Sequence, residues 1–548
     1  MKKTRTMLLL LALAGCAGAG GATTADDTVA GQDTVPGGDT ITEDDAFPGD
    51  DTVPGDDVTA PPSLSYPIVD TGLAWCFDAN ACGACPAAGG AFSGQDDMVQ
   101  GHAPDYQDNG DGTVTDRVTG LMWQQDPGVK MTWFDAMDGA DGFSLAGYDD
   151  WRLPSIKELY SLIRFDGLDP SGCETAESCP ALAPFIDPVF AFEYGDEAAG
   201  ERLIDAQFAT TTEYVGTTMG GQHTMFGVNF ADGRIKGYPT AAMPGQPDGK
   251  LFFVLYVRGA AYGVNDLEDQ GDGTVADHAT GLTWLQEDSG AFGAGPEGDG
   301  TLSWEEALAW CEGLSLAGHD DWRLPDAKEL QSIVDYTRAP AITGTAAIDP
   351  VFQASPILDE GGAENFPFYW SSTTHAGVGA GALSGGNAAY VAFGEALGFM
   401  AMNGPATLMD VHGAGAQRSD PKIGDPADYP TGHGPQGDVI RIFNHARCVR
   451  GGPAQAISEG AECPVTEGGG REEPREGPVA CQGEADCAAP GACPPEAGMG
   501  CTCATDPMGQ KMCVPVCQTD DDCPVDPVLS LICAPEGICV PAAGGTPR

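Results

Sequence analysis

Hydrophobic and polar positions follow the same order in two long stretches of the chain. In each stretch a turn-prone Gly-Asp-Gly sequence precedes a β-prone Thr-Val run, which predicts a β-hairpin. Apolar residues then recur at helical spacing, as at Trp304, Ala307, Leu308 and Cys311. Later segments such as residues 228–230 are β-prone and interrupted by glycine. Helices first and strands later predict an α+β domain.

Two helix starts are marked in each stretch. Thr132 and Ser303 begin sequences that resemble capping boxes, and so do Ser155 and Asp326. The second pair follows the proline of an Arg-Leu-Pro sequence, and proline keeps the residue before it extended. We therefore expect a strand-to-helix junction at this proline.

The shared pattern is a duplication. Asp-Gly-Thr-Val-x-Asp begins at residues 111 and 272, and Asp-Asp-Trp-Arg-Leu-Pro begins at residues 149 and 320. Ile-Asp-Pro-Val-Phe and Val-Arg-Gly follow in the same order in both copies. Each copy exceeds a hundred residues, so we expect two complete domains, at about 101–260 and 261–453, as twin units rather than one intertwined core.

Six of the nine tryptophans recur as pairs between the copies. Large aromatic side chains dominate the energetics of protein cores, so we expect all six in the core rather than at a ligand. The pairs are Trp123 with Trp284, Trp133 with Trp304, and Trp151 with Trp322.

The chain begins like an exported protein. Lys2, Lys3 and Arg5 precede an apolar stretch at residues 7–14 that is too short to span a bilayer. We interpret residues 1–16 as a signal peptide whose Leu-Ala-Gly-Cys end resembles the lipobox of bacterial lipoproteins, with Cys16 as the lipidated residue. Such a protein is anchored to the bacterial cell envelope through acyl chains, at the outer membrane or cell surface. The alternative is an ordinary secretory signal with a chance cysteine.

Charge is distributed unevenly along the chain. Residues 17–65 hold eleven acidic side chains and no Lys or Arg, which predicts a disordered acidic linker. The formal net charge of -56 argues against nucleic acid as a partner, since phosphates favour basic surfaces.

Cysteine usage also fits export. Assigning Cys16 to lipid leaves 18 of the 19 cysteines, an even number that suggests disulfides. Ten of them crowd into residues 481–539, so residues 454–548 are predicted to be a small disulfide-rich module. A short segment at residues 66–100 holds three more, which form an even set with Cys463. Structural bridges are favoured there over redox or metal chemistry, and the pairing stays open. The three are Cys76, Cys82 and Cys85.

Comparison of the copies indicates one particular disulfide. Cys311 falls on Ala140 of copy one, and Cys448 falls on Tyr256, so both thiols are present together or absent together. We predict a bond from Cys311 to Cys448 that ties the first helix to the last strand. Copy one has its own pair, Cys173 and Cys179, which are close enough to form a local bond.

Closely spaced aspartates near the hairpins allow a second interpretation, a calcium loop. The spacing does not match an EF-hand, so the turn is favoured, and calcium is the one cofactor that we consider. The aspartates concerned are Asp108, Asp111, Asp116, Asp272 and Asp277.

These motifs together resemble the Lcl C-terminal domain family of bacterial proteins. The marks are the hairpin, Thr-Gly-Leu-x-Trp, Asp-Trp-Arg-Leu-Pro followed by Lys-Glu-Leu, Tyr-Trp-Ser-Ser-Thr-Thr, and Cys-Val-Arg. Copy one has Phe-Ala-Thr-Thr-Thr at residues 208–212 in place of the Trp-Ser-Ser-Thr-Thr run. The Arg-Leu-Pro junction and the late Val-Arg-Gly are also similar to sulfatase-modifying and C-type-lectin-like domains. The resemblance implies two tandem C-type-lectin-like α+β domains, in a family whose members include polysaccharide-binding adhesins.

The leading hypothesis is a cell-surface binding or adhesion module for a glycan or a surface protein. We do not expect an enzyme: an oxidase related to the formylglycine-generating proteins would need a reactive thiol pair, which copy one lacks. Neither His-Glu-x-x-His nor Gly-x-Ser-x-Gly is present for hydrolysis. A passive structural envelope protein is the third possibility. The sequence does not identify the residues that bind the ligand.

Overall fold

A computed structural model of the chain describes residues 63–179, 181–241, 249–379, 382–401, 404–452 and 463, with the backbone of four short strands between residues 501 and 541. The predicted signal peptide with Cys16, almost all of the acidic linker, and the disulfides of the cysteine-rich tail lie outside the described residues. In the tail, β23 (Cys501–Thr505) pairs with β24 (Lys511–Pro515), and β25 (Leu531–Cys533) pairs with β26 (Cys539–Pro541). No helix in the described part is long and apolar enough to cross a bilayer.

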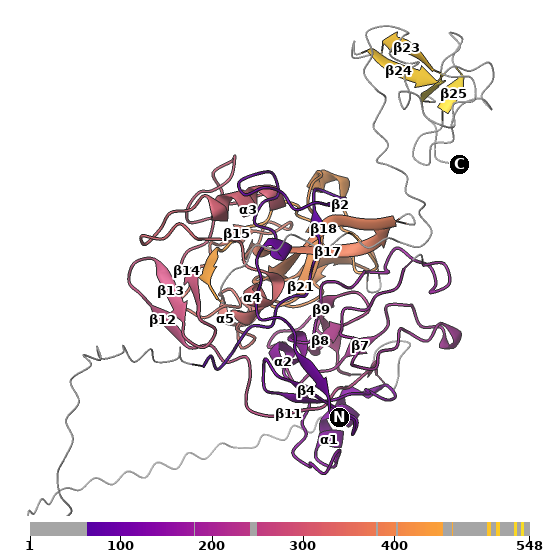
Figure 1. Cartoon of the computed structure of the whole chain (residues 1–548), viewed down its shortest axis with the longest axis vertical. Helices are drawn as coiled ribbons and strands as arrows, with labels where there is room; N and C mark the ends of the chain where they lie inside the picture. Colours follow the sequence, from indigo (N-terminus) through magenta and orange to yellow (C-terminus); the bar gives the residue numbers. More distant parts are fainter. Residues whose placement is uncertain are drawn as a thin grey trace, which may run out of the picture. The chain divides into compact units, whose positions relative to one another are not determined.

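Each copy begins with a four-stranded antiparallel sheet of the same topology (Figure 1). The predicted hairpin forms the first two strands of each sheet, and the last strand of the copy pairs with the third. The last strand of each copy therefore forms the edge of the sheet opposite to the first strand. The strands are β3 (Tyr106–Asp108), β4 (Thr113–Asp116), β5 (Met122–Gln124) and β11 (Val257–Arg258) in copy one, and β12 (Leu267–Asp269), β13 (Thr274–Asp277), β14 (Leu282–Leu285) and β22 (Val449–Gly451) in copy two.

The helices begin at the predicted caps. Ser155, Ser303 and Asp326 form complete capping boxes with the glutamate three residues later, whereas the Thr132 hydroxyl accepts a hydrogen bond from the Asp135 amide without the reciprocal bond. The helices are α1 (Trp133–Ala140) and α2 (Ile156–Tyr160) in copy one, and α3 (Trp304–Glu312), α4 (Ala327–Ser332) and α5 (Pro340–Thr343) in copy two.

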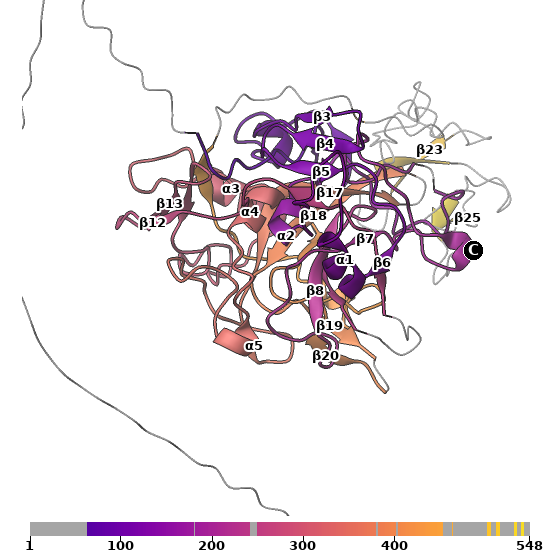
Figure 2. The same ribbon diagram turned by 90° about the horizontal axis from the view of Figure 1, so that it is seen from below.

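The two copies share one six-stranded sheet, to which each contributes three strands. Figure 2 shows β17 and β18 of copy two and β8 and β7 of copy one, which belong to this sheet. Its order is β17 (Phe368–Gly379), β18 (Ala382–Ala392), β21 (Gln417–Pro421), β9 (Arg234–Pro239), β8 (Thr224–Asn229) and β7 (Gln207–Phe208). The copies meet where Gln417 lies opposite Ile235 and the Gly237 amide donates to the His412 carbonyl at 2.9 Å. The junction covers an edge that each half alone would expose to solvent.

The hydrophobic core follows the shared sheet. One buried cluster contains Trp123 and Leu159 of copy one together with Trp284 and Leu330 of copy two. The two copies therefore share part of their interior, because the edge pairing draws the inner faces of both copies into one cluster. Each copy keeps a smaller cluster of its own around its first helix.

The prediction for the six paired tryptophans is confirmed, since none is more than 7% exposed. Trp123 and Trp284 lie in the shared cluster, and the other four lie in the clusters of the individual copies.

Short strands and 3-10 helices complete the described part. They are β1 (Cys76–Phe77), β2 (Cys82–Gly83), β6 (Met131–Thr132), β10 (Leu251–Phe252), β15 (Ile357–Leu358), β16 (Glu364–Asn365), β19 (Leu397–Met400), β20 (Thr407–Asp410), and the 3-10 helices Asp96–Met98, Glu197–Ala199 and Pro426–Asp428.

The segment that precedes copy one is part of the core rather than a spacer. Tyr66 and Phe77 belong to the shared cluster. The buried Asp96 carboxylate accepts hydrogen bonds from the hydroxyls of Thr71 at 2.9 Å and Thr373 at 2.6 Å, and so ties this segment to copy two.

Asp96 should make stability depend on pH. Burial first, and then the nearby Asp70 carboxylate, raises the pKa of Asp96 to about 8. Because this folded-state pKa exceeds the unfolded value of about 3.9, the resulting stabilisation is complete below about pH 4 and is lost as the pH rises through 8. We expect Asp96→Asn, which cannot ionise, to gain at least about 1 kcal/mol relative to the parent protein between pH 5 and pH 9. Urea unfolding of both proteins at the two pH values measures this, and an unchanged difference in stability would contradict it.

A groove on copy one as the candidate functional site

Four disulfides connect the described cysteines. The predicted Cys311–Cys448 and Cys173–Cys179 bonds are both present. The set whose pairing was open forms Cys76–Cys85 and Cys82–Cys463, so the two cysteines of the Cys-x-x-Cys sequence bond elsewhere and not to each other. The second of these bonds joins the segment before copy one to the chain after copy two.

In copy one a tyrosine stands where copy two has the Cys311–Cys448 bond. The Tyr256 hydroxyl donates to the Ala136 carbonyl of α1 at 2.9 Å. The same hydroxyl lies 2.7 Å from the position that a Cβ on Gly139 would take. Tyr256 therefore bridges the last strand and the first helix without a covalent bond, and burial raises its pKa.

The aspartates considered for calcium serve as turn acceptors. Asp108 accepts from the Gly110 amide, Asp111 from Thr113, and Asp116 from the amides of Val118 and Thr119. Asp272 and Asp277 act in the same way in copy two, through Thr274 and Ala279. In the described part of the chain these carboxylates do not converge as ligands; the trio that does is Cys76, Cys85 and Asp97. The two sulfurs of that trio are joined in a disulfide, so they offer no thiolate.

The repeated Arg-Leu-Pro and Lys-Glu-Leu sequences build the joint between the copies. Within copy two, Arg323 binds Glu329 through two hydrogen bonds of 2.6 Å. The lysines cross to the other copy: Lys157 donates to the Ser332 carbonyl at 2.6 Å, and Lys328 donates to the Ser161 carbonyl at 2.9 Å. Burial is the largest influence on both lysines and lowers the pKa of each to about 8.

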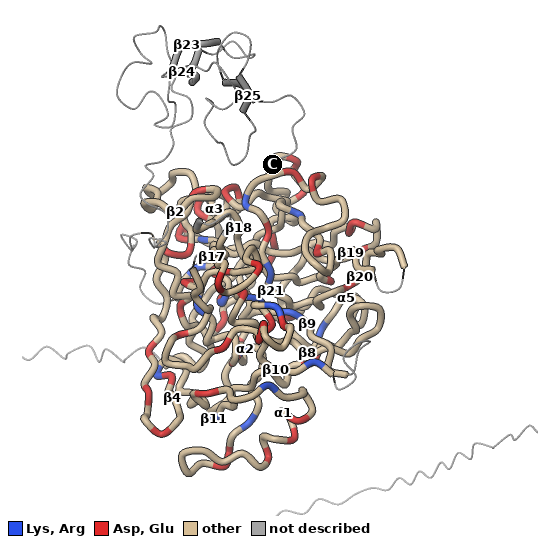
Figure 3. Tube along the Cα trace, turned by 90° about the vertical axis from the view of Figure 1, so that its right-hand side faces the viewer, with Lys and Arg blue, Asp and Glu red and all other residues tan. Residues whose placement is uncertain are grey.

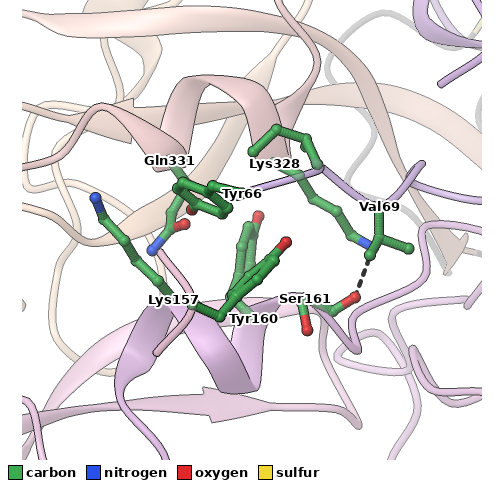
Figure 4. Close-up of a pocket in the computed structure, with 9 residues that line it drawn as sticks. Tyr66, Val69, Lys157, Tyr160, Ser161, Lys328 and Gln331 are labelled. Carbon is green, nitrogen blue, oxygen red and sulfur yellow. Dashed lines mark hydrogen bonds between the residues drawn. The ribbon is translucent and has the colours of Figure 1, made fainter. Parts of the chain in front are cut away.

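A small cavity lies between these lysines on the joint (Figure 4). Tyr66, Tyr160 and Tyr262 contribute to its lining, and the buried Tyr160 hydroxyl has no hydrogen-bond partner among the described residues. Its volume is about 10 Å³, which is close to the lower limit for one water molecule. The cavity is too small for an organic ligand.

Cations gather at the β9–β21 junction, where they are neutralised (Figure 3). Arg234 lies 2.7 Å from Asp169, and Lys236 lies 2.9 Å from Asp232. Burial alone would raise the pKa of Asp169, but Arg234 outweighs it and the pKa falls to about 2. Burial lowers the pKa of the neighbouring His375 to about 4, which leaves it neutral at pH 7. The cations Arg234 and Lys236 are thus paired with carboxylates of the fold itself.

A larger depression than this cavity lies on copy one, beside α1. Its volume is about 440 Å³, and we call it the groove. Its surface is mainly apolar and aromatic, with an amide and a carboxylate among its polar groups. The lining residues are Gln124, Pro127, Gly128, Val129, Met131, Asp135, Gly139, Phe143, Val254 and Tyr256.

Copy two fills the equivalent space with its own chain. Nine residues lie between Trp123 and Trp133, whereas nineteen lie between Trp284 and Trp304, so copy two carries ten extra residues. These lie within residues 288–301, from which Phe292 contacts Trp310, the counterpart of Gly139, with ring centroids 5.8 Å apart. The groove residues were missed in the sequence, although this difference in length was a signal for them.

Next to the groove, equivalent hydrogen bonds in the two copies show that the sequence alignment of the copies must be shifted by one residue. The indole of Trp133 donates to the Thr210 carbonyl, as that of Trp304 does to the Ser371 carbonyl. Residue 209 therefore corresponds to residue 370, and residues 208–212 match residues 369–373 rather than 370–374. Ala209 thus takes the place of the buried Trp370, which packs in copy two with its indole bonded to the Leu302 carbonyl at 2.9 Å.

These features define a class: a duplicated, disulfide-bonded protein of mostly β structure, with two copies joined through one sheet and a groove on copy one. Residues 112–246 and 273–406 each match the model of the Lcl C-terminal domain, so the chain is a tandem Lcl C-terminal domain protein. No curated protein and no solved structure matches it. The structure extends each copy beyond the matched stretch to its closing strand, β11 or β22.

Proposed function

We propose that this chain is an exported, lipid-anchored protein of the bacterial cell envelope that binds a ligand in the groove of copy one. The observation that carries the proposal is the contrast between the copies. Copy two closes the equivalent space with residues 288–301 and Trp370, whereas copy one leaves about 440 Å³ open. An apolar concavity with a few polar groups is the usual form of a binding site.

Two ligand classes fit the lining. The ring of Phe143, which packs on the buried Tyr256 with ring centroids 4.7 Å apart, suits a sugar face, while Gln124 and Asp135 can bind hydroxyls. These groups fit a glycan bound to a C-type-lectin-like α+β domain. A surface protein is the second candidate, supported by Val129, which is 83% exposed on the rim.

Binding is favoured over oxidase chemistry by the state of the cysteines. Cys311 and Cys448 are joined and fully buried, and Ala140 and Tyr256 replace them in copy one. A reactive thiol pair would have to be reduced and reached by substrate. A passive envelope role would leave the groove without a ligand, which the following experiment tests.

The experiment compares the whole oxidised chain with variants in which the groove is altered. In one variant residues 127–130 are replaced by the sequence of residues 288–301; in another, Asp135→Ala removes the lining carboxylate. Asp138→Ala, on the same helix but outside the lining, is the matched control. On glycan arrays and surface-protein panels, with and without calcium, we expect saturable binding that falls at least tenfold in both groove variants and is unchanged in the control. Absence of any saturable ligand, or equal binding by all four proteins, would overturn the proposal.

A further inference from the structure

We propose that the groove receives an extended polypeptide segment of a partner protein, with an aromatic anchor residue and a net positive charge. This inference rests on the proposed function, because it assumes that the groove is the binding site. It adds the class of ligand and the way in which the ligand is held.

Copy two shows what this fold accommodates at the same place. The Ser289 amide donates to the Ala446 carbonyl at 2.9 Å, and the Ala446 amide donates to the Ser289 hydroxyl at 2.9 Å. Phe292 contacts Trp310, and Ala294 is buried in the cluster of copy two. The occupant is thus a glycine-rich peptide segment that combines a backbone hydrogen bond with an aromatic contact, in which the half-exposed Phe292 ring lies against Trp310.

The counterpart of Ala446 in copy one is Val254, which lines the groove. Among the described residues, neither the amide nor the carbonyl of Val254 has a hydrogen-bond partner, although the residue is only 1% exposed. Unpaired buried backbone groups are costly, and a peptide that pairs with them in a strand-like manner gains affinity from the same bonds that Ser289 supplies in copy two.

The charge around the groove determines whether the bound segment should carry a positive or a negative net charge. Asp135 lines the groove, and no Lys or Arg does. The nearest cation in sequence, Lys130, is already held by the Glu201 carboxylate and the Asp205 carbonyl. Acidic positions of α1 are visible along the trace in Figure 3. With a net charge of -56 on the chain, a basic segment is attracted and an acidic one is repelled.

The test uses a phage-displayed library of random twelve-residue peptides, panned against the whole oxidised chain. Peptides that also bind the variant carrying residues 288–301 in place of residues 127–130 are removed. We expect the enriched sequences to contain an aromatic residue and a positive net charge. The Kd of the leading synthetic peptide should rise at least tenfold with Asp135→Lys and less than twofold with Asp138→Lys, which changes net charge equally. Replacing the aromatic residue of the peptide with alanine should also weaken binding at least tenfold.

The outcomes separate this inference from the proposed function. No enrichment, or enrichment of acidic peptides without aromatic residues, would overturn the peptide inference even if the grafted variant misfolds, because Asp135→Lys tests the same site. Glycan binding that is lost in the groove variants, without any peptide binding, would keep the proposed function and overturn this inference. Failure of both ligand classes would overturn both.

Discussion

A double variant with Cys311→Ala and Cys448→Ala should lose about 4 to 5 kcal/mol of unfolding free energy, judged by the chain entropy that the disulfide removes. The two cysteines are 137 residues apart, so the bond closes a long loop in the unfolded chain. Both side chains are fully buried between α3 and β22. Their replacement by alanine therefore also removes packing contacts, which lowers the unfolding free energy further. Urea unfolding at pH 7 under oxidising conditions measures the loss.

The matched control removes the other bond that lies within one copy. Cys173 and Cys179 are only six residues apart, so the same relation gives about 2 kcal/mol for their double alanine variant. Equal losses of unfolding free energy in the two variants would contradict the conclusion that the Cys311–Cys448 bond stabilises copy two. An unchanged unfolding free energy without that bond would also contradict it.

The two copies differ in how the first helix is held to the last strand and in whether the groove is open. Copy two is covalently closed and fills its own groove, whereas copy one replaces the bond with a hydrogen bond from Tyr256 and leaves the groove open. Because the copies share one sheet and one core cluster, copy two supports copy one directly. Under the proposed function, copy two would serve as the rigid support for the copy that binds the ligand.

Local features of the fold could be predicted from the sequence. The hairpins at residues 111 and 272 depend on neighbouring glycines, and the helix starts at Ser155 and Asp326 depend on residues within one turn. The Cys311–Cys448 bond was predictable because the second copy supplied a comparison. Each of these signals lies within a few residues or within the repeat itself.

The shared sheet and the groove depend on information of another kind. Whether β21 meets β9 depends on which strand edges remain free once each copy has folded, and Gln417 opposite Ile235 leaves no local trace. The one-residue shift that sets Ala209 against Trp370 could not be found from the sequence, because residues 208–212 share more identical residues with residues 370–374 than with residues 369–373. A groove forms where side chains and a loop are absent, so no single residue of the sequence indicates its position.

Glu329→Ala should destabilise the protein by about 3 to 5 kcal/mol, because it leaves the Arg323 guanidinium buried without its counter-charge. Both side chains of this pair are 8% exposed, and their two hydrogen bonds of 2.6 Å place the charge inside the joint. Glu158→Ala is the matched comparison in copy one, since Glu158 also completes a capping box and pairs with an arginine. There Arg152 is 38% exposed, so water can solvate the freed cation and the loss should be about 1 to 2 kcal/mol. The cap is removed in both variants, so the difference between them isolates burial of the charge. Thermal or urea unfolding of the two proteins measures it, and a larger loss for Glu158→Ala would show that desolvation does not set the strength of these pairs.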